Sequence, residues 1–192
     1  MRPLFYMNIN RTRLFTIMAL FLTVLIVPAS GHARGVYQEP QAFLSEVFAG
    51  KPPDASMLWI KKDLKKKAHA ILGHDLGVLR LHYWGCDGRT VWILDEIGKE
   101  QPITAGIVID HGQIELVRVL VFRETRGWEI RYPFFTDQFK GVTLDSEYKL
   151  DKGIDGISGA TLSVHALTKL ARLALLLHRH SPFADKPRTI QK

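Results

Sequence analysis

From Val78 onward the chain alternates strand-like runs with tight turns, and it then closes on one long helical pattern. The runs are "VLRLHYW", "TVWILDEIG", "ITAGIVID" and "QIELVRVLVF", and all are rich in the β-branched and aromatic residues that favour strands. Between the last two, His111 and Gly112 predict a two-residue hairpin turn with Gly at positive φ. Apolar residues then recur at helical spacing at Val164, Leu167, Leu170, Ala171, Ala174 and Leu177. Strands grouped before a final helix predict an α+β domain, with a twisted antiparallel sheet flanked by helices and a C-terminal helix beginning at Thr161.

Four shorter segments complete the expected architecture. The segment "YQEPQAFLSEVFAG" predicts a short helix that begins near Pro40 and stops at Gly50. In "MLWIKKDLKKKAHAIL", helical periodicity predicts a second helix, capped by Asp54 or Ser56. Further along, "RGWEIRY" favours another strand, and "FTDQFKG" a helical turn ended by Gly141.

The lysine-rich helix expected in this region has two interpretations. Its apolar face would be formed by Leu58, Leu64, Ala68 and Ile71. Five lysines lie among its other positions. A solvated outer face explains them, and a basic surface for an acidic partner or a membrane is the alternative.

The N-terminus is typical of an export signal. Arg11 and Arg13 precede the uncharged run "LFTIMALFLTVLIV", which Pro28 ends. Small residues follow, with Gly31 and Ala33 suited to the −3 and −1 positions of a cleavage site. A cleaved signal peptide and a retained N-terminal anchor both fit, and no cysteine follows the run to carry a lipid. Either way, the sequence predicts an exported domain, in the periplasm or on the outer face of the cytoplasmic membrane.

Composition excludes several classes of function. The 192 residues are 46% hydrophobic and 23% charged, and the formal net charge is +7. Three of the basic residues lie in the leader, so the rest of the chain has only a mild excess that does not predict nucleic-acid binding. Cys86 is the only cysteine, which excludes an internal disulfide, a c-type haem and a thiolate metal site, and we expect it to be buried. The histidines show no metal-like grouping, and no catalytic motif stands out, so the sequence predicts neither a metal site nor catalytic residues.

The segment "DGISGAT", residues 155–161, is where the sequence most clearly suggests chemistry. Gly156 and Gly159 let the backbone bend and let a ligand approach the amides. Thr161 then opens the apolar helix, whose first amides lack helical partners and lie at the positive end of the helix dipole. An anion such as a phosphate is stabilised there. Ser and Thr are also favoured caps, so a plain helix start explains the same residues.

The same segment resembles the attachment motif of the FMN-binding domain family. That family includes the flavin-carrying subunits of the sodium-pumping NADH:quinone reductase and of the Rnf electron-transport complex. In it the final Thr hydroxyl forms a phosphoester with FMN, which a separate flavin transferase installs. The resemblance therefore implies covalent FMN on Thr161. It also implies that Asp155 belongs to the motif and that Ser158, Gly159 and Ala160 shape the phosphate pocket.

Two further elements match the family in order and spacing. In "IVIDHGQIELVRVLVFRETRG", Glu124, Thr125 and Gly127 match the family's Glu-Thr-x-Gly element, whereas Arg126 stands where proline is common. "FTDQFKG" is similar to its Phe-x-x-Gln-Phe-x-Gly element. By this resemblance Glu124 and Thr125 contact the flavin ring or ribityl chain, although a strand-end turn with an exposed acid fits equally well. Trp128 is expected in the core rather than stacked on the ring.

These observations divide the chain and suggest its function. We expect a signal peptide or anchor over residues 1–33, a helical and strand region over 34–100, an FMN-binding core over 101–180 and a loose tail over 181–192. The resemblance implies an exported flavoprotein that relays electrons, with a flavin transferase and a membrane redox protein as partners. Two alternatives stay open. One is a small flavin-dependent reductase of a soluble acceptor such as a quinone or ferric chelate, and the other is a non-redox binding or sensing module.

Overall fold

The computed structural model describes residues 35–184, which lie within a compact unit spanning residues 34–192. The predicted leader, residues 1–33, and residues 185–192 of the tail lie outside the described residues. The sheet is an antiparallel meander of five strands in the order β1-β2-β3-β4-β5. Its strands are β1 (Ser56–Trp59), β2 (Arg80–Cys86), β3 (Arg89–Ile97), β4 (Pro102–Asp110) and β5 (Gln113–Phe122). This confirms the predicted α+β class. The sheet includes strands from both sides of residue 100, where the sequence divided the domain into two regions, because β3 pairs with β4.

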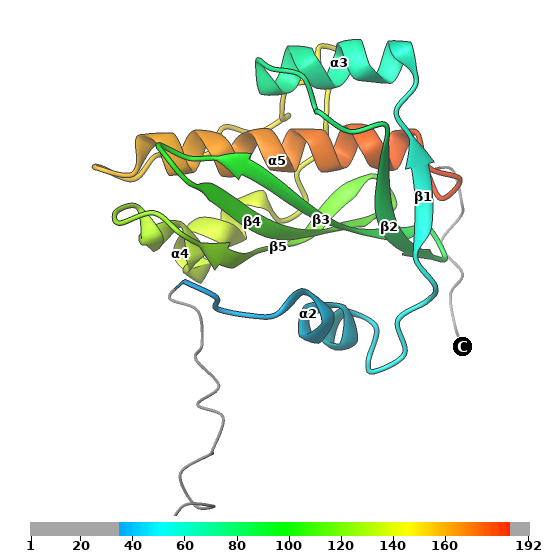
Figure 1. Ribbon diagram of the computed structural model, residues 1–192, viewed down its shortest axis with the longest axis horizontal. Helices are drawn as coiled ribbons and strands as arrows, with labels where there is room; N and C mark the ends of the chain where they lie inside the picture. Colours follow the sequence, from blue (N-terminus) through cyan, green and yellow to red (C-terminus); the bar gives the residue numbers. More distant parts are fainter. Residues whose placement is uncertain (1–34, 185–192) are drawn as a thin grey trace, which may run out of the picture. The chain divides into compact units, whose positions relative to one another are not determined.

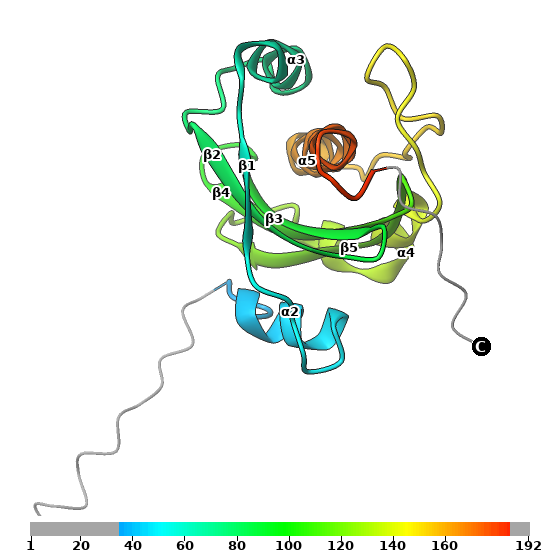
Figure 2. The same cartoon turned by 90° about the vertical axis from the view of Figure 1, so that its right-hand side faces the viewer.

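Helices cover both faces of this sheet (Figures 1 and 2). The long helix α5 (Thr161–Arg179) lies along one face, with α3 (Lys62–Leu72) packed beside it, and α2 (Pro40–Val47) covers the opposite face. The apolar positions predicted for α5 are all buried, as are Leu64, Ala68 and Ile71 of α3. Because helices lie against both faces, β4 is buried along most of its length and is apolar at nearly every position.

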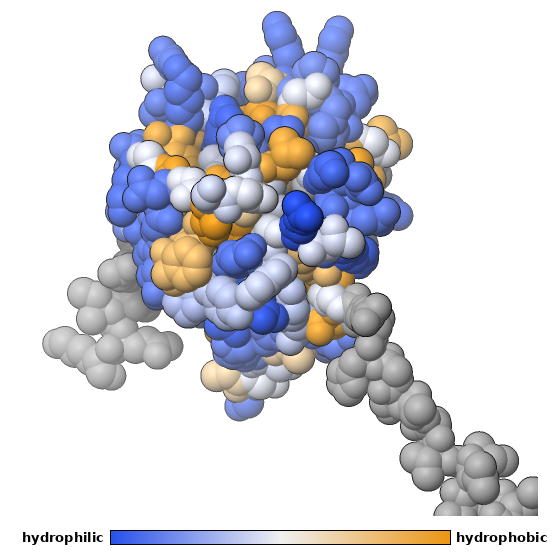
Figure 3. Space-filling view, turned by 90° about the vertical axis from the view of Figure 1, so that its left-hand side faces the viewer, coloured by the Kyte–Doolittle hydropathy of each residue, from blue (hydrophilic) through white to orange (hydrophobic). Residues whose placement is uncertain are grey.

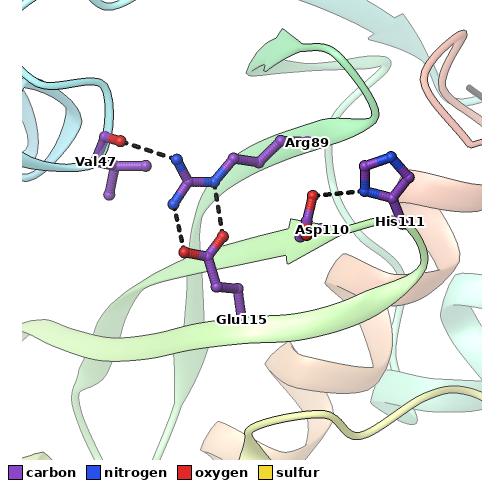
Figure 4. Close-up of polar contacts among 5 residues, drawn as sticks. All are labelled: Val47, Arg89, Asp110, His111 and Glu115. Atoms are coloured by element: carbon purple, nitrogen blue, oxygen red, sulfur yellow. Dashed lines mark hydrogen bonds and ion pairs between the residues drawn. The ribbon is translucent and has the colours of Figure 1, made fainter. Parts of the chain in front are cut away.

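A polar clamp fastens α2 to the sheet (Figure 4). Arg89 donates from Nε and Nη2 to the two carboxylate oxygens of Glu115, at 2.7 and 2.6 Å, and from Nη1 to the carbonyl oxygen of Val47, at 3.0 Å. One guanidinium thus joins β3, β5 and the end of α2. Next to it, His111 and Gly112 form the predicted hairpin turn, with φ of 48° and 80°.

Three expectations about the secondary structure and about Cys86 are wrong. The helix expected from Met57 begins only at Lys62, and its N-cap is Lys61 rather than Asp54 or Ser56. Residues 57–59 belong to β1 instead, because they pair with β2. The segment "RGWEIRY" is not a strand but a 3-10 helix, η1 (Trp128–Arg131). Cys86 is exposed rather than buried.

The remaining elements follow the sequence more closely. The "FTDQFKG" segment forms α4 (Pro133–Thr136) and the 3-10 helix η2 (Asp137–Phe139), and Gly141 follows with a φ of 75°. Phe183, in the segment expected to be a loose tail, packs edge-on against Tyr83 with ring centroids 6.2 Å apart. None of the helices within residues 35–184 has both the length and the apolar character needed to cross a membrane.

Candidate functional site

Thr161 is the first residue of α5 and is exposed. Ahead of it, Gly159 adopts a φ of 80°, and the N–H of Ala160 donates to the carbonyl of Ile157 at 3.0 Å, which closes a tight turn. Ala160 is the N-cap, and no side chain makes a capping hydrogen bond. The helix is held by its buried face, so this turn presents the Thr161 hydroxyl at a fixed, uncapped and electropositive helix start.

The loop after β5 rests directly on this helix start. Gly127 has a φ of 88°, and a Cβ added to it would lie 2.5 Å from Ser163 Oγ and 3.2 Å from Ser163 Cβ. Only glycine combines that backbone conformation with so close an approach. Gly127 therefore allows residues 123–127 to pack on the first turn of α5, next to Thr161.

Glu124 ties a third segment to the same place. Its Oε1 accepts hydrogen bonds from the backbone N–H groups of Lys99, Glu100 and Gln101, at 2.6, 2.7 and 2.9 Å. Burial by itself raises the pKa of Glu124, but the three N–H donors outweigh it and lower the pKa below its ordinary value. The carboxylate thus holds the β3–β4 turn against the loop, which is a structural role that local sequence did not reveal.

Gln138 fastens the loop before Thr161, residues 155–160, from the other side. Its Oε1 accepts a hydrogen bond from the backbone N–H of Asp155 at 2.8 Å. Through this contact, η2 holds the segment that leads to Thr161. Sequence reasoning noted the element but assigned no role to Gln138.

Thr161 lines two open cavities, one on each side of it, and a third cavity adjoins one of these two. The first has a volume of about 340 Å³ and is lined by Lys99, Glu124, Thr125, Arg126 and residues 159–163. The adjoining cavity, of about 440 Å³, shares Glu124 and Thr125 with the first and extends to Tyr37 and Trp128. On the other side of Thr161, a basic hollow of about 430 Å³ includes Lys152, His165 and Arg172 in its lining. The cavities that Glu124 and Thr125 line lie at the end of the molecule where α5 begins. Figure 3 shows this end, where hydrophobic side chains lie among hydrophilic ones.

The cavity beside Trp128 has an aromatic wall. Trp128 is 41% exposed, so it is not the core residue that the sequence predicted. Residues 35–38 run along the edge of β5, and the N–H of Tyr37 donates to the carbonyl of Leu120 at 2.8 Å, which brings Tyr37 to this wall. The Arg131 guanidinium packs over both rings, 4.3 Å from the ring centroid of Tyr37 and 5.4 Å from that of Trp128. No local signal in the sequence pointed to Tyr37 or Lys99.

The structure thus gathers most, but not all, of the sequence-predicted site. Glu124, Thr125, Gly159, Ala160 and Thr161 line one cavity, and Gly127 supports it from below the first turn of α5. Asp155 and Ser158 are exposed on the preceding loop and line none of the three cavities. Asp155 contacts Gln138 through its backbone N–H. No group of three or more histidine, cysteine or acidic side chains in residues 35–184 is arranged to hold a metal ion.

Comparison with protein families identifies this arrangement. Residues 98–176 match the model of the FMN-binding domain. That part of the chain is therefore similar to the FMN-binding domain family. The matched segment begins at the β3–β4 turn held by Glu124 and includes the Gly127 loop, Gln138 and Thr161. Searches of curated proteins and of solved structures found no match to this chain.

The residues present suit FMN. Arg126 and Lys99, the latter paired with Glu100 at 3.2 Å, line the cavity beside the uncapped helix start, where a phosphate is stabilised. The adjoining cavity offers indole and phenol rings of the kind that a flat heterocycle stacks on. Both cavities are within the size range of ligand pockets.

Proposed function

We propose that this protein is an exported flavoprotein that carries FMN as a phosphoester on Thr161 and relays electrons. The observation that supports it most strongly is the position of the Thr161 hydroxyl. It lies at an uncapped helix start beside Lys99, Arg126 and two cavities, inside a segment that matches the FMN-binding domain model.

The ester bond would anchor the unreactive end of the cofactor. Its formation joins Thr161 Oγ to the flavin phosphorus, and the hydroxyl proton is lost. Ester formation from free FMN would release water and is unfavourable in water. The flavin transferase therefore has to use a flavin phosphoanhydride, whose second phosphate group leaves. Exposure of Thr161 on the surface gives such a transferase access to the hydroxyl.

The rest of the site then orients the ring. From Thr161, the route past Thr125 leads to the cavity walled by Tyr37 and Trp128. When bound, FMN supplies the electron-transfer chemistry, and the protein supplies position and electrostatics. We infer that the ring lies against Trp128, and that electrons pass between it and a membrane redox protein.

Expression of the full chain with a flavin transferase tests the attachment. After denaturing electrophoresis, flavin fluorescence should stay with the wild-type band and disappear in Thr161→Ala. Ser158→Ala is the matched control, because it removes a hydroxyl three residues away that lines none of the cavities, and this variant should keep the flavin. Flavin that washes away from the denatured wild-type protein would refute the ester.

A further inference from the structure

A second exposed apolar region lies away from the Thr161 site. Ten large apolar side chains are exposed in residues 35–184, and six of them lie on or next to the elements that build that site. The other four are Met57, Trp59, Val78 and Leu79, of which Trp59 is 56% and Leu79 is 78% exposed. Exposed apolar side chains gathered in this way mark an interaction surface.

The four side chains belong to one corner of the fold. Strand β1 is at the edge of the sheet, and Trp59 lies opposite Arg80 in its register with β2. The guanidinium of Arg80 is 5.8 Å from the centroid of the Trp59 ring. One residue further on, the N–H of Ile60 donates to the carbonyl of Leu79 at 2.9 Å. Residues 57–60 and 78–80 are therefore neighbours, at the end of β1 that leads into α3 (Figure 2).

The same corner carries uncompensated positive charge. Among the described residues, Lys61, Lys62, Lys66 and Arg80 form no ion pair, whereas both nearby acids are neutralised. Asp63 pairs with Lys67 at 2.6 Å and Asp75 with Lys65 at 2.9 Å. An open hollow of about 630 Å³ along α3 is lined by Lys62, Lys65, Lys66 and His69 together with these two acids. We call this region the Trp59 surface and define it as Met57, Trp59, Lys61, Lys62, Lys66, Val78, Leu79 and Arg80.

This combination fits a lipid surface better than a protein partner. Lysine is depleted from protein–protein interfaces. By contrast, Lys and Arg beside exposed Trp and Leu are typical of segments that lie in the interface of an anionic bilayer. There the aliphatic and aromatic tips enter the headgroup region, and the cations attract acidic lipids.

We propose that the Trp59 surface binds the anionic surface of a lipid bilayer. It adjoins the C-terminal end of α5, because α3 packs on α5 and begins, directly after β1, beside that end (Figure 1). Thr161 is at the other end of the 19-residue helix, roughly 27 Å away along its axis. A protein bound in this way holds its cofactor site clear of the bilayer, where the water-exposed redox centre of a partner can reach it. The proposal does not depend on the flavin.

Vesicle binding by the chain that begins at Arg34 tests this proposal without the leader. All buried core residues of the described part lie between Phe43 and Leu177, so this chain keeps the whole core. We expect co-sedimentation with vesicles that contain phosphatidylglycerol, no binding to phosphatidylcholine alone, and weaker binding as salt rises. Each lysine near an anionic bilayer contributes about fivefold in binding. The double variant Lys62→Gln, Lys66→Gln should therefore bind roughly 25-fold more weakly, whereas Lys140→Gln, Lys152→Gln, with the same net charge, should bind as the wild type.

Tryptophan fluorescence identifies the inserting side chain. A blue shift on vesicle binding should be lost in Trp59→Phe and kept in Trp128→Phe, with circular dichroism confirming that both variants fold. Equal binding to both kinds of vesicle, or equal loss in both lysine pairs, overturns the proposal. Self-association that Trp59→Ala abolishes would assign the surface to a second copy of the chain, and would overturn it as well.

Discussion

Replacement of Gly127 by alanine should separate the 123–127 loop from the start of α5. Two costs add at this position. A left-handed φ of 88° costs a non-glycine residue about 1–2 kcal/mol. Alanine also lowers the conformational entropy of the unfolded chain, and this offsets about 0.4–1 kcal/mol of that cost. The new Cβ also meets Ser163 Oγ at 2.5 Å and Ser163 Cβ at 3.2 Å. Ser163 can move its hydroxyl but not its Cβ, so overpacking adds about 1–3 kcal/mol.

The chain offers a matched control for the first cost. Gly112 has a similar φ of 80°, but a Cβ added there meets no atom within 4 Å. We expect Gly112→Ala to lower the free energy of unfolding by about 1 kcal/mol, and Gly127→Ala by about 2–4 kcal/mol. Adding Ser163→Ala to Gly127→Ala should restore part of the difference, because it removes the nearer atom.

Urea unfolding gives the free energies, and flavin fluorescence after denaturing electrophoresis gives the loading on Thr161. Gly127→Ala should load less flavin, because the wall of the cavity beside Thr161 moves, whereas Gly112→Ala should load normally. If the two variants are equally stable and equally loaded, the close approach of Gly127 to Ser163 does not position the site, and the reasoning fails.

Other contacts yield shorter predictions. The pKa of Glu124 is lowered, so the stability it adds is present above its ordinary value of 4.5 and is lost as pH falls through the lower folded value; Glu124→Gln should flatten the acid limb of a plot of unfolding free energy against pH. Hydrogen bonds to Asp75 and then Glu96 raise the pKa of His74, so its contribution is complete below 6.5 and is lost as pH rises through the folded value; His74→Gln should remove this loss on the neutral limb of the same plot. Trp128→Leu should brighten the fluorescence of bound flavin, because a stacked indole quenches it, and unchanged brightness in a fully loaded variant would place the ring elsewhere.

The sequence predicted those elements that carry a local signal of their own. Strands β2 to β5 appear where β-branched residues cluster, and α5 begins at Thr161. The helix expected from Met57 failed because residues 57–59 pair with β2, a long-range contact that overrides helical periodicity. The strand expected from "RGWEIRY" failed for a related reason. Residues 35–38 already occupy the free edge of β5, and the left-handed Gly127 turns the chain into η1 instead.

In the candidate site, too, the sequence predicted the residues of short local motifs but not the long-range contacts between them. The residues named from the motif, such as Thr125 and Thr161, are consecutive with short patterns that the sequence displays. The bonds that assemble the patterns join residues far apart in the chain. Glu124 reaches the amides of residues 99–101, and Gln138 reaches Asp155. Such partners depend on the packed fold, and Tyr37 lies outside the family segment altogether, so no local pattern could have identified them.

The geometry of the helix start argues against the other explanation of residues 155–161, in which Ser or Thr only caps the helix. A capping Ser or Thr places its side-chain oxygen on the N–H groups of the first turn. Here the N-cap is Ala160, which has no such oxygen, and no other side chain makes the capping bond. Ser158 is exposed on the loop, and Thr161 is already the first helical residue. Neither hydroxyl therefore caps the helix. An anion held between Lys99 and Arg126 is the group that would complete this helix start, and a phosphate joined to Thr161 would be held within reach of it.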